Sequence, residues 1–291
     1  MPFPERYEDL GRIARGGWGE VRRVRDLAMD RVIVAKVLAW EHVESERLVE
    51  RFLNEARVTA SLDHPGIVPV LDGGTLPDDR PWFAMKEVVG RTFREILDEP
   101  TDPIDPATML RRHVEVLVRI SEIVGYAHER RVVHRDLKPS NVMVGRFGEV
   151  LVLDWGVARR AGDPVPQTRA RPKGDASTTQ PGDILGTTSY MAPEQARGAH
   201  RDVGPAADVY AIGLVLFEIL HGQRARRGTQ ITQWSQATRG ENPPIERGPE
   251  ELRTICERAL RVDPSARFPD GMAIATALRA WLDGAARVQR A

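Results

Sequence analysis

The sequence predicts an α+β fold in which a small β-rich lobe precedes a larger helical lobe. Short runs that alternate or are rich in β-branched residues fill the first third of the chain. A long amphipathic pattern over Pro106–Glu129 opens the second part, and further helical patterns follow it. Because the character changes at Lys86–Gly90, we expect a small lobe over 1–85, a hinge over 86–90 and a large lobe over 91–284.

Five strands and one main helix are expected in the first part. The helix covers Glu44–Ser61, because Leu48, Phe52 and Glu55 recur on one face. It ends before His64-Pro65-Gly66, since proline and glycine interrupt helices. The expected strands are Leu10–Ala14, Glu20–Arg25, Val32–Leu38, Ile67–Leu71 and Trp82–Met85.

The second part is expected to be mainly helical, with two short apolar strands, Val142–Val144 and Val150–Leu153. The polar stretch from Ala158 to Ile184 is rich in Pro, Gly, Ser and Thr, so we expect a mobile loop there. Residues 285–291 are expected to form a disordered tail. The further expected helices are Ala206–Leu220, Thr229–Arg239, Pro249–Arg261 and Asp270–Leu282.

The composition restricts the classes of function. Lys plus Arg and Asp plus Glu both number 42, so nothing favours a nucleic-acid or membrane-surface partner. The single cysteine, Cys256, rules out an internal disulfide and argues against a thiolate zinc site. The longest apolar run, Val209–Phe217, falls short of the roughly 18 residues of a membrane span. Residues 1–12 are polar and charged, so no signal peptide is expected. We therefore expect a cytoplasmic location.

The segment His134–Asn141 carries the most informative chemistry. Pro139 prevents a regular helix, so polar groups gather in an irregular turn. Asp136 can accept a proton from a hydroxyl, Lys138 can neutralise a phosphate, and the Asn141 oxygen can hold a metal. Those are the needs of phosphoryl transfer. The alternative is a surface turn whose Asp and Asn cap helix ends.

This segment resembles the catalytic loop of protein kinases, and further kinase-like motifs occur in family order. Asp154-Trp155-Gly156 resembles the magnesium-binding motif, although the family usually has Phe at the second position. Gly186–Glu194, which ends in Ala-Pro-Glu, resembles the end of the activation segment. The best resemblance is to bacterial serine/threonine protein kinases of the eukaryotic type, which implies a bilobal protein-kinase-like fold.

Two motifs of the first part agree with this resemblance. Gly16-Gly17-Trp18-Gly19-Glu20-Val21 resembles the glycine-rich loop, except that the family's first glycine falls at Ala14. A simple Gly-Gly hairpin turn is the alternative. Lys36 lies on an apolar strand and needs a partner, because an unpaired buried ammonium is costly. The resemblance implies a pair with Glu55, and the alternative is that the lysine reaches solvent from the strand edge.

The resemblance implies a role for each site residue. Asp136 would orient the substrate hydroxyl and accept its proton, with Lys138 neutralising the transferring phosphoryl group. Lys36, fixed by Glu55, would position the phosphates of ATP. Asn141 and Asp154 would hold Mg²⁺, with Mn²⁺ as an alternative. The implied nucleotide site comprises Ala14, Gly16, Gly17, Gly19, Val21, Ala35, Lys36, Met85, Lys86, Val88, Asn141 and Asp154.

The same resemblance implies several structural and regulatory contacts. Glu194 would pair with Arg267, and Asp208 would anchor the backbone of the catalytic loop. Thr187 would bond near Asp136 and Lys138, while His134 is interpreted as a packing residue. Arg135 beside the catalytic base suggests a phosphorylated activation loop. The candidate phosphorylation sites are Thr168, Ser177, Thr178 and Thr179.

The sequence therefore predicts a kinase that transfers the γ-phosphate of Mg-ATP to Ser or Thr hydroxyls of protein substrates. Self-association for autophosphorylation in trans stays open. One alternative is a pseudokinase scaffold, suggested by Ala14 and Trp155, and another is a small-molecule phosphotransferase of related fold. Lys138 argues against the second alternative and against a tyrosine kinase. The substrate, the upstream signal and the oligomeric state stay open, as does membership of a longer receptor.

Overall fold

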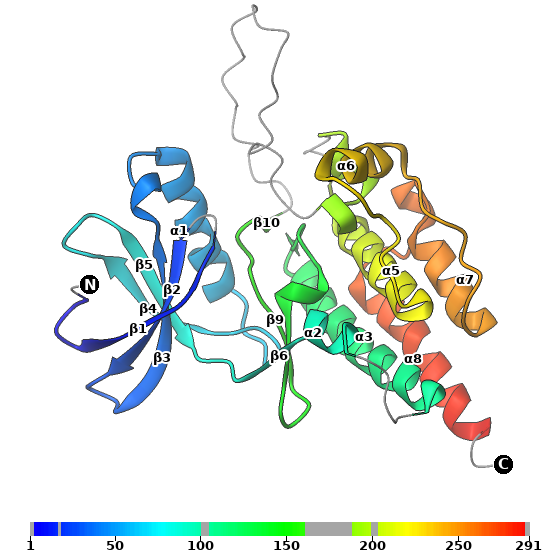
Figure 1. Ribbon diagram of the computed structural model, residues 1–291, viewed down its shortest axis with the longest axis horizontal. Helices are drawn as coiled ribbons and strands as arrows, with labels where there is room; N and C mark the ends of the chain where they lie inside the picture. Colours follow the sequence, from blue (N-terminus) through cyan, green and yellow to red (C-terminus); the bar gives the residue numbers. More distant parts are fainter. Residues whose placement is uncertain (1–2, 17–18, 100–104, 161–187, 199–202, 289–291) are drawn as a thin grey trace, which may run out of the picture. The chain divides into compact units, whose positions relative to one another are not determined.

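The computed structural model describes residues 3–16, 19–99, 105–160, 188–198 and 203–288 (Figure 1). The chain divides into two compact units. One comprises Met1–Phe93 and Asn141–Ala158, and the other comprises Arg94–Ser140 and Arg159–Ala291. Sheets dominate the first unit and helices the second, which confirms the predicted fold class.

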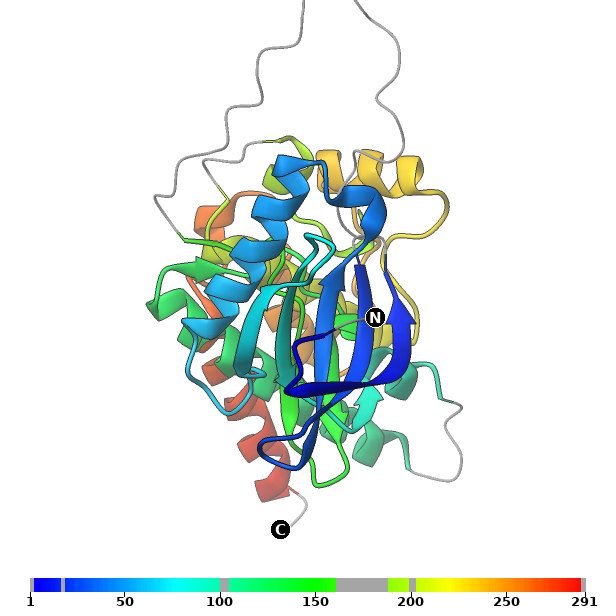
Figure 2. The ribbon, with the colours of Figure 1, turned by 90° about the vertical axis from the view of Figure 1, so that its left-hand side faces the viewer.

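The first unit is built on a five-stranded antiparallel sheet of order β1-β2-β3-β5-β4, with helix α1 packed on one face (Figure 2). A second sheet of order β6-β8-β9 completes it. The elements are β1 Tyr7–Arg15, β2 Gly19–Asp26, β3 Arg31–Leu38, η1 Trp40–His42, α1 Glu46–Ala60, β4 Val70–Thr75, β5 Pro81–Lys86, β6 Gly90–Thr92, β8 Val142–Gly145 and β9 Val150–Val152.

The central strand β3 has an apolar layer on each face. On one face Ala35 and Val37 pack in a cluster with Trp82. On the other face Leu38 packs against Phe52 of α1 and against Phe83. Burial on both faces explains why β3 reads as a nearly continuous apolar run rather than an alternating one.

One predicted strand lies elsewhere. The run Ile67–Leu71 was expected as a strand, but β4 covers Val70–Thr75. Ile67 instead forms an isolated parallel bridge with Val152. The prediction was wrong because β4 is an edge strand whose Asp-Gly-Gly sequence has no apolar pattern, and edges tolerate such residues.

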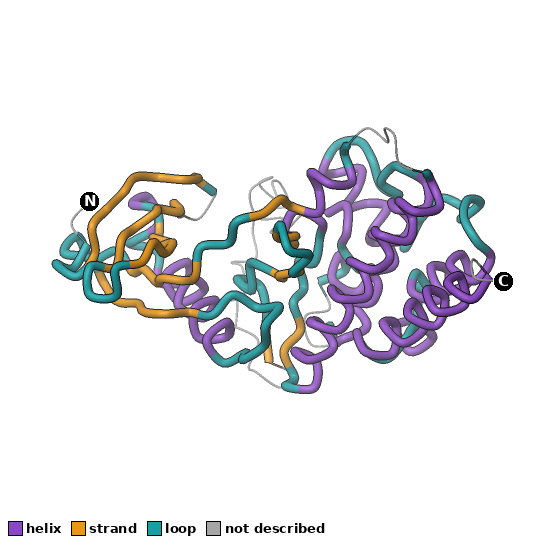
Figure 3. Tube along the Cα trace, turned by 90° about the horizontal axis from the view of Figure 1, so that it is seen from below, coloured by secondary structure: helices purple, strands orange, loops and turns teal. Residues whose placement is uncertain are grey.

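The second unit is a helical assembly in which α3 packs against α5 and α8 (Figures 1 and 3). Its helix α5 is buried along most of its length, as its apolar sequence predicts. A short two-stranded sheet pairs β7 with β10. The elements are α2 Phe93–Leu97, α3 Pro106–Glu129, β7 Val132–Val133, η2 Pro139–Asn141, β10 Arg159–Arg160, η3 Thr188–Tyr190, α4 Pro193–Ala196, α5 Pro205–His221, α6 Gln230–Arg239, α7 Glu250–Ala259, η4 Pro264–Ala266 and α8 Gly271–Val288.

Helix boundaries follow local sequence closely, with one correction. Helix α3 begins and ends as predicted, and the Asp105 carboxylate caps it by accepting the N–H of Thr108 at 3.0 Å. The tail expected from residue 285 was placed too early, because α8 continues through Gly284 to Val288. The alanines after that glycine favour helix and offset its low propensity. Among the helices described, none combines the length and apolarity needed to cross a bilayer.

A buried ion pair fixes α4 within the second unit, as predicted. The Arg267 guanidinium donates to both carboxylate oxygens of Glu194, each at 2.8 Å. It also donates to the carbonyls of Ala206, Arg261 and Val262. The carboxylate therefore has its charge compensated inside the protein, a condition that buried charges require.

We expect Arg267→Ala to lower the free energy of unfolding by about 3–5 kcal/mol, because the Glu194 carboxylate would stay buried without its partner. Denaturant unfolding followed by circular dichroism measures the change. Arg247→Ala, at an exposed position, is the matched control and should change stability by less than about 0.5 kcal/mol. Equal stability of the two variants would contradict the assigned role of the pair.

Candidate active site

In the first unit, Lys36 on β3 faces Glu55 on α1. The Nζ–Oε1 distance is 2.5 Å, and Asp154 Oδ1 lies 3.9 Å from the same ammonium. The Lys36 side chain is only 20% exposed, so it does not extend to solvent. Burial by itself would lower the pKa of Lys36, but the two carboxylates outweigh it and raise this pKa, which keeps the lysine protonated. The predicted pairing is confirmed.

Asp154 follows β9 in a left-handed conformation with φ 61°. Trp155 is buried, and its indole N–H donates to the carbonyl of Val152 at 3.3 Å. A Cβ on Gly156 would lie 2.9 Å from Glu55 Oε2, so a larger residue here would require the Glu55 carboxylate to move. The three motif residues thus have distinct roles. Asp154 presents its carboxylate, Trp155 packs its ring in the core, and Gly156 leaves space for Glu55.

Two further side chains of α1 hold the same segment, and sequence analysis missed both. Arg51 Nε donates to the Gly156 carbonyl at 3.1 Å, and Asn54 Nδ2 donates to the Ala158 carbonyl at 3.4 Å. Together with Glu55 they occupy helix positions i, i+3 and i+4, which lie on one face. That spacing was visible in the sequence, but only the structure shows that backbone carbonyls are their partners.

Asn141 is tied by its backbone to the strand that presents Asp154. Its carbonyl accepts the N–H of Leu153 at 2.8 Å. A carboxylate and a carboxamide are oxygen donors of the kind that Mg²⁺ takes from proteins, since this ion also keeps water and substrate phosphate ligands. Within the part of the chain that the structure describes, no cluster of three or more His, Cys, Asp or Glu residues could hold a metal by itself. The donor set therefore fits an ion bound together with a nucleotide.

The β1–β2 hairpin is closed by a hydrogen bond from Gly16 N–H to the Gly19 carbonyl at 2.8 Å. A Cβ on Gly19 would lie 2.3 Å from the Val37 carbonyl oxygen, so β2 can start this close to β3 only with glycine. Ala14 pairs with Val21 across the hairpin. The predicted Gly17 lies outside the described residues.

The structure does not bring Ala35 to the face that carries Lys36. Successive strand residues point to opposite faces, and Ala35 belongs to the apolar cluster on the far side of β3. Val34 occupies the position expected for Ala35, because Val34 pairs with Met85 and lies on the same face as Lys36. Of the expected hinge contacts, Lys86 is exposed and Val88 is half-buried.

In the second unit, Asp208 on α5 anchors the catalytic loop, as predicted. Its carboxylate accepts the backbone N–H groups of His134 and Arg135, both at 2.8 Å. His128 Nε2 lies 2.9 Å from the same carboxylate, and Gly271 N–H lies 3.1 Å from His128 Nδ1. The imidazole therefore accepts at Nδ1 and donates from Nε2 to Asp208.

The environment keeps Asp208 ionised although it is buried. Burial alone would raise its pKa, but donors from His128 and Arg135 outweigh that effect and lower it. Arg135 has φ 68°, a left-handed conformation uncommon for a side chain of its size. The carboxylate thus holds the loop in a backbone conformation that it would rarely adopt alone.

Asp136 and Lys138 lie together in this loop. The Lys138 Nζ donates to Asp136 Oδ2 at 2.7 Å, and both side chains are mostly shielded from solvent. Asp136 N–H donates to His134 Nδ1 at 3.3 Å, and His134 is fully buried. His134 is therefore a buried packing residue, as expected, and Asp136 and Lys138 form a carboxylate–ammonium pair in the same turn.

The segment before α4 is held by residues that sequence analysis missed. The hydroxyls of Thr188 and Ser189 both donate to Gln233 Oε1 on α6 at 2.8 Å. Gln195 Nε2 donates to the Arg135 carbonyl at 2.8 Å, which ties α4 to the catalytic loop. A glutamine on a polar helix gives no sequence pattern that would identify these contacts. Thr187 and the four candidate phosphorylation sites lie outside the described residues.

A buried acid-base cluster completes this region. The Tyr190 hydroxyl donates to Glu218 Oε2 at 2.6 Å, and Arg94 pairs with the same carboxylate at 2.8 Å. Burial, with Glu218 adding to it, raises the pKa of Tyr190, so the phenol stays protonated.

The side chain of Arg135 also has a partner in the second unit. The Arg135 guanidinium donates to the Val203 carbonyl at 3.1 Å.

Comparison with known proteins supports a specific family. The chain matches the family model for the protein kinase domain over residues 7–278. The serine/threonine-protein kinase PknD of Chlamydia muridarum (strain MoPn / Nigg) is 33% identical over 302 residues, covering 96% of this chain and 32% of the relative. The PknD of Chlamydia caviae is 32% identical over 296 residues, covering 96% of this chain and 31% of the relative. The chain thus spans about a third of the length of the curated relatives that it matches.

Proposed function

Since this chain belongs to the protein kinase family, we propose that it transfers the γ-phosphate of ATP to Ser or Thr hydroxyls of protein substrates. The observation that carries the proposal is that two charged pairs are both formed. Lys36 pairs with Glu55 in the first unit, and Lys138 pairs with Asp136 in the second. The naming of the PknD relatives as serine/threonine kinases supports the class of substrate.

Asp136 orients the substrate hydroxyl and accepts its proton as the oxygen attacks phosphorus. Lys138, which already holds one oxygen of that carboxylate, neutralises charge on the transferring phosphoryl group. Such a reaction needs little covalent chemistry from the protein, so positioning and electrostatic stabilisation supply the rate. The anchoring of the loop backbone by Asp208 keeps both groups in place.

The nucleotide binds to the sheet face that carries Lys36. The Lys36 ammonium contacts the α- and β-phosphates and Glu55 fixes its position, while the hairpin residues Gly16 and Gly19 border the phosphates. Adenine lies against Val21, Val34 and Met85, where Val34 replaces the Ala35 expected from sequence, and it bonds the backbone near Lys86 and Val88. The support is the shared face of Val34, Lys36 and Met85.

Asn141 and Asp154 would hold Mg²⁺, with Mn²⁺ as an alternative. When bound, a divalent cation would neutralise negative charge on the phosphates of ATP. The protein presents the Asp154 carboxylate at the end of β9, and 48% of that side chain is exposed to solvent. The Asn141 carbonyl fixes the neighbouring Leu153, so both donors come from segments that are held together.

A pseudokinase scaffold is the alternative, and the geometry lends it little support. It rested on Ala14 and Trp155. Trp155 is buried with its N–H bonded to Val152, so a tryptophan is accommodated without an unpaired polar group.

We also propose that the protein is located in the cytoplasm and that two copies associate for phosphorylation in trans.

We expect Asp136→Asn to reduce turnover about a hundredfold or more, because an amide cannot accept the hydroxyl proton. ATP binding should persist, since the residue does not contact the nucleotide base or its phosphates in the proposed mechanism. Initial rates with a generic basic protein and calorimetric ATP binding measure the two effects. Asp283→Asn, at an exposed position of α8, is the control. Wild-type turnover in Asp136→Asn refutes the assignment of the base.

We also propose that the activation loop is autophosphorylated and that Arg135 binds the resulting phosphate. Exchange of the Val203 carbonyl for a dianion at the guanidinium would strengthen this contact. Mass spectrometry after incubation with Mg-ATP should find phosphate at Thr168, Ser177, Thr178 or Thr179. Absence of any ATP-dependent phosphate between Ala158 and Tyr190 would remove this proposal while leaving phosphoryl transfer to other proteins in place.

A further inference from the structure

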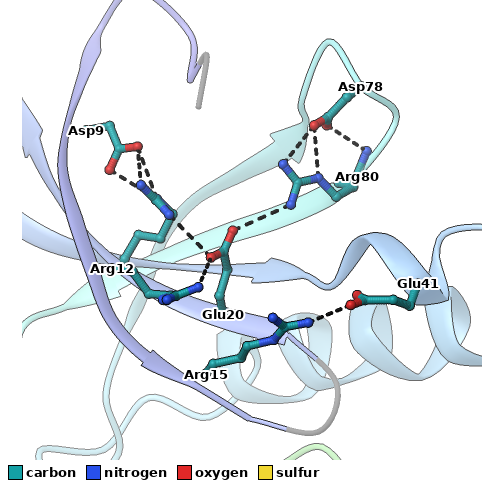
Figure 4. Close-up of polar contacts among 8 residues, drawn as sticks. Asp9, Arg12, Arg15, Glu20, Glu41, Asp78 and Arg80 are labelled. Carbon is teal, nitrogen blue, oxygen red and sulfur yellow. Dashed lines mark hydrogen bonds and ion pairs between the residues drawn. The ribbon is translucent and has the colours of Figure 1, made fainter.

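A network of six charged side chains links the β1–β2 hairpin to the turn before β5 (Figure 4). Glu20, the first residue after Gly19, is its centre. We name it the Glu20 network. Its members are Asp9 and Arg12 on β1, Glu20 and Arg22 on β2, and Asp78 and Arg80 in the turn before β5.

Three arginines converge on the Glu20 carboxylate. Arg22 Nη1 lies 3.3 Å, and Arg12 Nη1 3.9 Å, from Glu20 Oε2. Arg80 Nη1 lies 3.5 Å from the other oxygen, Oε1. Glu20 therefore links the outer strand β1 and its own strand β2 to the turn that precedes β5.

Two more carboxylates complete the network at its ends. Asp9 Oδ2 accepts from Arg22 Nη2 at 2.6 Å, and Asp78 Oδ2 accepts from Arg80 Nη2 at 2.7 Å. Three carboxylates thus balance three guanidinium groups. Removing the charge of Glu20 would leave three cations facing two anions.

The centre of the network is shielded from water, whereas Arg12 at its edge is 53% exposed. The side chains of Glu20, Arg22 and Arg80 are 13%, 16% and 10% exposed. Ion pairs shielded in this way are screened less by salt than exposed pairs. The nearby pair Arg15–Glu41, also drawn in Figure 4, is more than half exposed on both sides and contributes less.

Glu20 lies on the sheet face opposite the proposed nucleotide. It neighbours Val21 on one strand, so the two side chains point to opposite faces. Val21 pairs with Lys36 across β2 and β3, which places it on the Lys36 face. A change at Glu20 therefore acts on the hairpin without removing any group that would touch ATP.

The hairpin needs such support because β1 is an edge strand with irregular pairing. The register of β1 on β2 shifts between Asp9 and Gly11 and again between Arg12 and Ala14. Shifts of this kind interrupt the ladder of backbone hydrogen bonds. Arg12 lies at the second irregularity, where its side chain reaches Glu20 and adds a contact that the backbone lacks.

We propose that Glu20 is a positioning residue for ATP binding, which holds the ends of β1 and β2 in the geometry that receives the phosphates. This inference rests on the proposed function. Fixing the hairpin in advance reduces the ordering that nucleotide binding requires, so it favours affinity and not the chemical step. Glu20 touches neither the reacting atoms nor the nucleotide.

The test compares Glu20→Gln, which keeps the size of the side chain, with Asp30→Asn. Asp30 also pairs with an arginine of β2, Arg25, but at the opposite end of that strand. Glu20→Gln should raise the KM for ATP about three- to tenfold, with kcat at saturating ATP within about twofold of wild type. Asp30→Asn should change neither constant, and Glu20→Asp should restore part of the affinity.

Hydrogen exchange provides a second readout that a purely structural role would not move in the same way. Peptides covering residues 10–25 should exchange faster in Glu20→Gln than in wild type without nucleotide, and equally with saturating ATP. A KM for ATP equal to wild type in Glu20→Gln overturns the inference, as does a variant in which kcat falls while KM stays constant. A wild-type protein that neither binds nor uses ATP refutes the proposed function itself, so the two failures are distinguishable.

Discussion

The buried carboxylate of Asp208 is the constraint on which the catalytic loop depends. It receives two backbone N–H groups of that loop, and the imidazole of His128 fixes it from α3. An ionised group can stay buried only with such compensation, so this carboxylate and the loop conformation require each other. Because His128 is bonded in turn to the first residue of α8, three helices determine the path of the loop. Asp136 and Lys138 therefore take their positions from the helical core.

In the first unit, helix α1 fixes the position of the site residues, as the Asp208 carboxylate does in the second. Three side chains on one face of α1 reach Lys36 and two carbonyls of the segment after Asp154. Displacement of α1 would therefore affect Lys36 and the proposed metal ligand Asp154 together. The Glu20 network acts on the opposite side of the sheet, where it supports the hairpin from behind. The positions of the residues proposed to bind the nucleotide thus depend on contacts made elsewhere in the first unit.

Motifs and periodic apolar patterns predicted the paired charged residues and the main helices. The resemblance to the kinase family implied the Lys36–Glu55 and Glu194–Arg267 pairs, and apolar periodicity predicted α3. The prediction for Ala35 was wrong although strand alternation places this residue on the face opposite its neighbour Lys36, because a shift of one residue reverses the face. Gln233, Arg51 and the partners of Glu20 were missed because polar side chains bonding to distant groups leave no periodic pattern.

In the proposed function, the Asp154 carboxylate and the Lys36 ammonium serve ATP-dependent phosphoryl transfer. The most direct measurement is transfer of radiolabelled γ-phosphate to a generic basic protein by wild type and by Asp154→Ala. We predict clear incorporation by wild type and at least about a hundredfold less by the variant, because the cation would lose its carboxylate. Folding of the variant is checked by its thermal unfolding. Equal incorporation by the two proteins, or none by wild type with magnesium or manganese, would contradict the proposed phosphoryl transfer.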